Sequence, residues 1–248
     1  MSTPRREGAR KRNPISGGGR PGQVVELVHL DREPAGEAEG ALILLHGRGV
    51  DERDLYPLLD ELDPERKLFG ITPGAPLTNV PPGGRHWYVV EQVGHPDEQT
   101  FVDSLGMLCR FLDDELRHRG IAWEKTVIGG FSQGAAVACA VALGMGRPRP
   151  AGLLMMSGFY PMVRGWKVDP RAKRGLPAYV THGSYDPVIP VGFGRKARDL
   201  LEKGGLYVTY REARVQHSID FELIPEMRDW VGSVISGEPV IEGPPSAR

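Results

Sequence analysis

The stretch GGFSQGAAVA, residues 129–138, decides the fold of this 248-residue chain. It follows the apolar residues TVI and opens a run of small residues, so it predicts a strand that turns directly into a helix. Residues 130–134 read GFSQG, the pattern G-x-S-x-G, in which the glycines relieve crowding at a sharp turn. Such a turn exposes the hydroxyl of Ser132 and places the next amide at the amino end of the helix. Ser132 is therefore predicted to be a nucleophile, and a role as a simple helix cap is the alternative.

Short apolar runs alternate with helical patterns on both sides of this stretch. The alternation predicts an α/β fold with a mostly parallel central sheet and helices on both faces. Ligands bind such sheets at the carboxyl ends of the strands, so functional residues are expected directly after strands. The predicted strands are residues 24–30, 41–47, 67–73, 125–131, 151–158, 177–183 and 206–212. The predicted helices follow Asp51, which we expect to cap the first of them, and cover residues 98–119, 132–145, 190–203 and a last segment with Pro225 in its first turn.

The length and composition are those of a single globular domain with looser ends. We expect the domain to span residues 23–236. Residues 1–22 are basic, rich in glycine and nearly free of large apolar side chains, which predicts a disordered leader. They lack the apolar core of a secretory signal, and this favours a cytoplasmic protein. Residues 237–248 are expected to form a loose tail.

Charge and cysteine content exclude several classes of function. The formal net charge is −1, so the charge gives no reason to expect a nucleic-acid partner. No apolar run approaches the roughly 18 residues of a membrane span, which predicts no stable membrane insertion. The two cysteines, Cys109 and Cys139, lie in apolar runs and are expected to be buried thiols rather than a disulfide or ligands of a metal.

A serine nucleophile needs a base and an acid later in the chain. In α/β-hydrolases the order is serine, then aspartate or glutamate, then histidine. Only His182 and His217 follow Ser132, and His217 is the one that leaves room for an acid before it. Asp186 comes soon after a predicted strand and precedes Pro187 in a turn, whereas Asp199 lies in a predicted helix. Asp186 and His217 are therefore the predicted acid and base; a turn aspartate and a surface histidine are the alternatives.

The oxyanion of an acyl-transfer intermediate needs preset N–H donors. One candidate is the backbone amide of Gln133, directly after the serine. The second is the backbone amide of Arg48, which lies between Gly47 and Gly49 in the loop after a predicted central strand. We expect His46 to hold this loop rather than to act as a base. Plain turn glycines are the alternative interpretation.

These motifs together resemble a known family. LHGRGVDERDL, GFSQGA, HGSYDPVIP and QHSID are similar to segments of the phospholipase/carboxylesterase family, the acyl-protein-thioesterase-like branch of the α/β-hydrolases. The resemblance spans roughly residues 23 to 236. It implies an enzyme without a cofactor that cleaves carboxylic esters or thioesters of small to medium acyl chains through an acyl-enzyme. It also implies a triad of Ser132, Asp186 and His217.

The resemblance further implies an acyl pocket near Trp87, in the segment GGRHWYVV. Leu77 lies on the same long loop and is a second candidate for contact with the substrate. We expect both side chains at the rim of the cleft, with core packing as the alternative. One departure from the family is Gln216, which stands directly before His217 where the family usually has glycine.

Two other functions compete with a serine esterase. One is a related enzyme on the same fold, such as a peptidase or a dienelactone-type hydrolase, although the latter normally has cysteine at the position of Ser132. The other is a non-catalytic binding module that has kept the fold; an intact triad argues against it. The expected partner is a small-molecule ester or thioester. The sequence leaves open whether the chain is a monomer or a homodimer.

Overall fold

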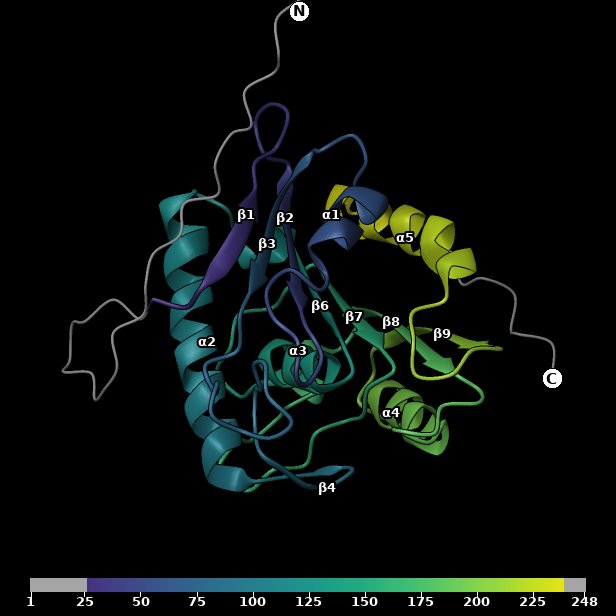
Figure 1. Cartoon of the computed structure of the whole chain (residues 1–248). Coiled ribbons are helices and arrows are strands. Elements are labelled where there is room, and N and C mark those ends of the chain that lie inside the picture. The colour runs from purple at the N-terminus through teal and green to yellow at the C-terminus, as the bar shows by residue number, and fades with distance from the viewer. Residues whose placement is uncertain (1–25, 239–248) are drawn as a thin grey trace, which may run out of the picture.

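The computed structural model describes residues 26–238 (Figure 1). The predicted leader, residues 1–22, lies outside the described residues, as do residues 239–248 of the predicted tail. A seven-stranded sheet in the order β1-β3-β2-β6-β7-β8-β9 forms the centre of the fold. β1 pairs antiparallel with β3 and the other neighbouring strands pair in parallel, which confirms the predicted architecture. The strands are β1 (His29–Arg32), β2 (Gly40–Leu45), β3 (Leu68–Pro73), β6 (Thr126–Phe131), β7 (Gly152–Met156), β8 (Pro177–Gly183) and β9 (Tyr207–Ala213).

Helices cover both faces of the sheet. Alternate residues of β2 point to opposite faces: Ile43 packs in one apolar cluster and Leu44 in the other. Helices α2 (Glu98–His118), α3 (Gln133–Leu143) and α4 (Gly192–Lys203) contribute to the first cluster. Helices α1 (Tyr56–Leu62) and α5 (Ile224–Ser236) contribute to the second. Every residue of α3 is buried, because its small side chains let the helix lie close to the sheet.

Two local predictions were wrong. Residues 26–28 were predicted to belong to the first strand but precede it: β1 begins at His29, and its register with β3 runs from His29 opposite Pro73 to Arg32 opposite Gly70. Residues 24 and 25 of that prediction lie outside the described residues. Asp51 does not cap α1: its carboxylate accepts a hydrogen bond from the backbone N–H of Arg53 at 2.9 Å, and α1 begins five residues after it. Asp51 therefore stabilises the turn before the helix instead.

The long segment between β3 and α2 was predicted as a loop and contains a small hairpin, β4 (Val90–Gln92) and β5 (His95–Pro96). Before the hairpin it pairs back onto the loop after β2, with Val50 bridged to Arg85. None of the helices within residues 26–238 combines the length and the apolar character needed to cross a bilayer.

Candidate active site

Ser132 stands between the centre of the sheet and helix α3. It directly follows β6, the fourth of the seven strands, and has φ 55° and ψ −114°. A non-glycine residue in the left-handed region costs about 1–3 kcal/mol, so the surrounding packing must hold it there. Glycine is required beside it: a Cβ on Gly134 would lie 2.0 Å from the backbone oxygen of Leu45, and one on Gly130 would lie 2.6 Å from the backbone of Gly134. The tight strand–helix contact thus fixes the strained turn.

The structure brings the three predicted triad residues together from the ends of different strands. Nε2 of His217 lies 2.9 Å from Oγ of Ser132, and Nδ1 of His217 lies 2.6 Å from Oδ2 of Asp186. A carboxylate only accepts, so Nδ1 carries the proton and Nε2 is free to accept from the serine hydroxyl. This arrangement can take a proton from the hydroxyl and hold it on an imidazole beside a carboxylate.

Asp186 is oriented by its own turn. Its side chain is fully buried, and its Oδ1 accepts hydrogen bonds from the backbone N–H groups of Val188 and Ile189, both at 2.8 Å. Oδ2 therefore remains for His217. The imidazole of His217 is 17% exposed and packs against the ring of Phe131, with 4.8 Å between ring centroids. The imidazole of His217 is thus open to solvent on one side and packed against Phe131 on the other.

Gln216 does not strain the loop that carries His217. Among the described non-glycine residues, positive φ occurs at Arg66, Ser132 and Ser157, and Gln216 is not one of them. Glutamine therefore fits before the histidine without the conformational freedom of glycine.

His182, the other histidine after Ser132, is buried beneath the turn of Asp186. Its Nε2 donates to the backbone oxygen of Ile189 at 2.7 Å and lies 3.5 Å from Oδ2 of Asp186. Burial lowers the pKa of His182, which keeps the ring neutral. His182 stabilises the turn and does not contact Ser132.

The loop after β2 lies against the serine. A Cβ on Gly47 would be 3.6 Å from the Cβ of Ser132. The backbone N–H groups of Arg48 and Gln133 donate no hydrogen bond to other groups within residues 26–238. Both amides are therefore free to bind an anion formed next to the Ser132 hydroxyl.

His46 holds this loop, as predicted. Its ring is buried: Nε2 accepts from the backbone N–H of Ala75 at 2.9 Å, and Nδ1 donates to the backbone oxygen of Gly47 at 2.6 Å. Burial lowers the pKa of His46 to about 4, so the ring is neutral at physiological pH.

Trp87 and Leu77, the two residues predicted to contact the substrate, differ in how deeply they are buried. Trp87 is fully buried, and its indole N–H donates to the backbone oxygen of His46 at 2.9 Å. Leu77 is half-buried and pairs with His86 in an isolated bridge. The burial of Trp87 favours core packing, the alternative to an acyl-pocket role.

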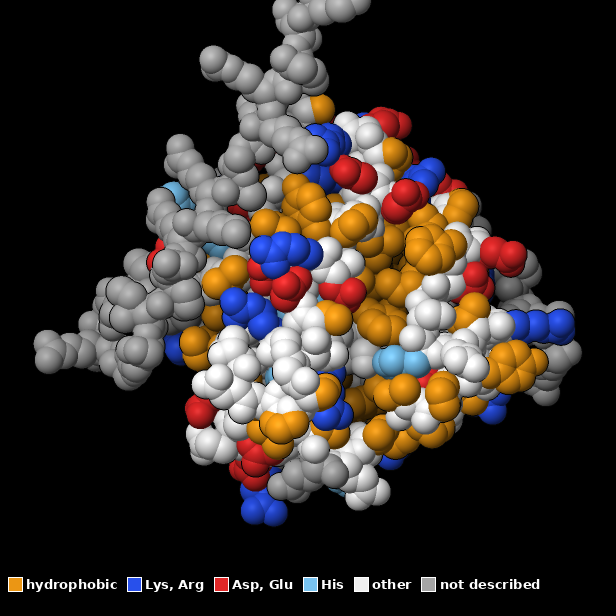
Figure 2. Space-filling view, in the orientation of Figure 1, with side chains coloured by type: hydrophobic (Ala, Val, Ile, Leu, Met, Phe, Trp, Pro, Cys, Tyr) orange, Lys and Arg blue, Asp and Glu red, His pale blue; other side chains and the backbone are white. Residues whose placement is uncertain are grey.

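Figure 2 shows apolar side chains gathered around a hollow near the centre of one face, with a histidine ring exposed at its edge.

The side chain of Gln133 has a role that sequence reasoning missed. Its Oε1 accepts from the backbone N–H of Trp87 at 2.7 Å, and its Nε2 donates to the backbone oxygen of Tyr88 at 2.8 Å. The only signal in the sequence was the polar residue at the start of an otherwise apolar buried helix.

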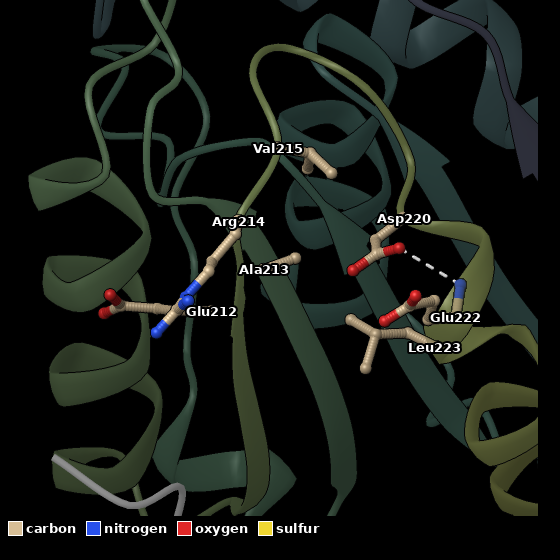
Figure 3. A pocket seen from close by; sticks show the side chains of 7 residues that line it. All are labelled: Glu212, Ala213, Arg214, Val215, Asp220, Glu222 and Leu223. Atoms are coloured by element: carbon tan, nitrogen blue, oxygen red, sulfur yellow. Dashed lines mark hydrogen bonds between the residues drawn. The ribbon is translucent and has the colours of Figure 1, made fainter.

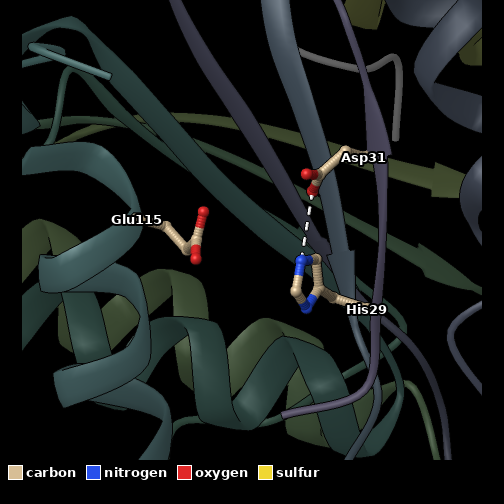
Figure 4. A group of neighbouring side chains, drawn as sticks. All are labelled: His29, Asp31 and Glu115. Atoms are coloured by element: carbon tan, nitrogen blue, oxygen red, sulfur yellow. Dashed lines mark ion pairs between the residues drawn. The ribbon is translucent and has the colours of Figure 1, made fainter. Parts of the chain in front are cut away.

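Two polar clusters lie outside this site. A hollow beside the His217 loop is bordered by Glu212, Arg214, Asp220 and Glu222 (Figure 3), where Asp220 accepts from the N–H of Glu222 at 3.0 Å. His29, Asp31 and Glu115 bring their ligand-type atoms within 4.8 Å of one another (Figure 4). Arg119 pairs with Asp31 at 2.8 Å, so this second cluster is an ion-pair network with its own cation.

Comparison with known proteins identifies the family. The profile of the phospholipase/carboxylesterase family matches residues 32–235, most of the chain. The chain belongs to the phospholipase/carboxylesterase family. It is 28% identical to acyl-protein thioesterase 1 of Candida albicans, over 80% of this chain and 93% of that protein. It is 26% identical to lysophospholipase-like protein 1 of Mus musculus, over 87% of this chain and 96% of the relative.

The fold is shared with solved members of this class. The carboxylesterase of Bacillus cereus superimposes with a TM-score of 0.72 at 22% identity, covering 84% of this chain and 94% of the other. The carboxylesterase of Mesorhizobium loti gives 0.72 at 18% identity, with 85% and 96% covered. The chain therefore has the α/β-hydrolase fold. Its membership of the phospholipase/carboxylesterase family makes it a hydrolase of the esterase and thioesterase class.

Proposed function

We propose that this family member is a serine hydrolase in which Ser132 attacks the carbonyl carbon of a carboxylic ester or thioester. His217 is the base, Asp186 orients it, and the backbone amides of Arg48 and Gln133 bind the oxyanion. The substrates are esters or thioesters of small to medium acyl chains. The observation that carries the proposal is the pair of hydrogen bonds that His217 makes: it accepts from the Ser132 hydroxyl at 2.9 Å and donates to the Asp186 carboxylate at 2.6 Å.

The reaction runs in two steps. As the Ser132 oxygen bonds to the acyl carbon, its proton moves to Nε2 of His217 and the carbonyl electron pair becomes the oxyanion. The intermediate collapses, the bond to the alcohol or thiol breaks, and His217 protonates that leaving group. A water molecule then attacks the acyl carbon while His217 takes its proton; as the bond to the Ser132 oxygen breaks, His217 returns the proton to that oxygen and the carboxylic acid is released.

The Ser132→Ala variant tests the proposal. Its kcat for a nitrophenyl ester should fall by roughly 10⁴-fold or more, because no nucleophile remains. Ser104→Ala is the matched control: Ser104 is a buried serine of α2 whose hydroxyl has no partner within the described residues, so its loss should leave kcat unchanged. Full turnover by Ser132→Ala would contradict the proposal.

A further inference from the structure

Residues 85–88 form hydrogen bonds with both elements that supply the amides proposed to bind the oxyanion. Each of these amides is located on a different element: Arg48 on the loop after β2, and Gln133 at the start of α3. Their separation must match the position of one oxygen atom to within a few tenths of an ångström, because hydrogen bonds weaken quickly with distance. The contacts that fix these two elements relative to each other therefore affect the reaction as well as the fold.

The first connection is made by the side chain of Gln133. Its two amide atoms bond the backbone of Trp87 and Tyr88, at 2.7 Å and 2.8 Å. Gln133 is 3% exposed, so both bonds are made away from water. Residues 87–88 are thus fixed to the residue that supplies one of the two amides.

The second connection is made by Trp87 and by its neighbour Arg85. The indole N–H of Trp87 donates to the backbone oxygen of His46 at 2.9 Å. The backbone N–H of Arg85 donates to Val50, and the backbone oxygen of Arg85 accepts from Gly49, both at 2.9 Å. Residues 85–88 therefore contact the loop after β2 both before and after Arg48.

His46 completes the arrangement through one peptide group. Its Nδ1 donates to the backbone oxygen of Gly47 at 2.6 Å, and that oxygen belongs to the same peptide bond as the N–H of Arg48. In a planar trans peptide the C=O and the N–H point in opposite directions. A ring that holds the oxygen therefore aims the N–H the other way. The hydrogen bond also polarises the peptide, which strengthens its N–H as a donor.

We propose that Trp87 and His46 are positioning residues that hold the Arg48 amide at a fixed place relative to the Gln133 amide. Trp87 acts here through the backbone oxygen of His46 and the side-chain amide of Gln133 and does not line the acyl pocket. The proposal rests on the proposed function, since it concerns the oxyanion of that reaction. The positioning role explains why the bulky indole of Trp87 is fully buried and why its only polar atom bonds a backbone oxygen of the loop after β2.

The Trp87→Phe variant separates positioning from substrate contact. Phenylalanine keeps an aromatic ring and the backbone N–H and removes the indole N–H. We expect kcat to fall about tenfold, less than the ~100-fold or more for losing a whole oxyanion donor. KM should change less than about twofold, and the loss should be equal for nitrophenyl esters of C2 to C12 acyl chains. Trp230→Phe is the control, because Trp230 is a buried tryptophan of α5 whose N–H has no partner among the described residues.

His46 provides a test that does not depend on how well Trp87→Phe packs. In His46→Asn the side-chain amide can occupy the place of Nδ1 and still donate to the Gly47 oxygen. In His46→Gln the amide reaches the place of Nε2 instead. We expect His46→Asn to retain several-fold more kcat than His46→Gln, and tighter binding of a trifluoromethyl ketone whose oxygen occupies the oxyanion site.

The outcomes distinguish this proposal from the proposed function. Equal kcat in the two His46 variants, or a Trp87→Phe variant that changes chain-length preference and keeps its kcat on the shortest ester, would overturn the positioning role. Labelling of the wild-type protein by a fluorophosphonate tests the proposed function separately. If Ser132 is labelled while the positioning results fail, the serine mechanism stands and this inference alone is wrong.

Discussion

The loop after β2 and the turn after β8 are built alike but depend on their histidines to different degrees. In each, a buried histidine donates to a backbone oxygen of the segment that follows: His46 to Gly47, and His182 to Ile189. His46 uses both ring nitrogens, whereas Nδ1 of His182 is buried with no hydrogen-bond partner in the described part of the chain. Asp186 is also held by two backbone N–H groups. Asp186 is thus fixed mainly by its own turn, and the Arg48 amide, which we propose to bind the oxyanion, is fixed mainly by its neighbours.

The largest effect is expected from the carboxylate that the β8 turn holds. Asp186→Asn keeps the shape of the side chain but can donate a hydrogen bond to Nδ1 of His217, which favours the wrong tautomer. We expect kcat to fall by about 10⁴-fold with the fold intact. Asp199→Asn is the control, because Asp199 is an exposed residue of α4 paired with Arg198. An Asp186→Asn enzyme within tenfold of the wild type would show that the turn does not serve catalysis.

A smaller difference is expected between the two histidines. His182→Ala removes one hydrogen bond from a turn whose aspartate keeps two others, so kcat should fall less than about tenfold. His46→Ala frees the Gly47 oxygen and should cost more, about 10- to 100-fold. Both are measured as kcat on one short nitrophenyl ester, with circular dichroism as the check on folding. A larger loss of kcat in His182→Ala than in His46→Ala would contradict this expectation.

A further prediction concerns the free energy of unfolding and its dependence on pH rather than turnover. The pKa of His46 is lowered from about 6.5 in an unfolded chain to about 4 in the fold. Between these values the unfolded state binds more protons, so stability is complete above about pH 6.5 and falls as the pH is lowered towards 4. The full loss from this residue is about 3 kcal/mol. Urea unfolding at pH 7 and pH 4.5 should show a smaller loss in His46→Asn than in the wild type; equal losses would contradict the assignment.

Much of the site could be predicted because it follows strand ends in chain order. The apolar runs marked the central strands, and Ser132, Asp186 and His217 each come soon after one of them. The glycines at 130 and 134 marked the tight turn, and the structure shows the backbone oxygen that excludes a larger residue there. These features are local, so a single stretch of sequence carries each of them.

The contacts that were missed join distant segments. The side chain of Gln133 bonds the backbone of residues 87 and 88, and no pattern in either segment predicts these hydrogen bonds. Trp87 was expected at a rim because a Pro/Gly-rich loop usually lies at the surface. It is buried because the loop folds back to pair with the segment after β2. The cap predicted at Asp51 failed for a different and local reason, since its carboxylate bonds the nearer N–H of Arg53.

Mass spectrometry of the intact protein after reaction with a nitrophenyl ester shows whether the reaction passes through an acyl-Ser132 intermediate. We expect a covalent acyl adduct that maps to Ser132 in the wild type, and no such adduct in Ser132→Ala or, on the same timescale, in His217→Asn. An adduct on another residue, or one that forms as fast in His217→Asn as in the wild type, would contradict the account.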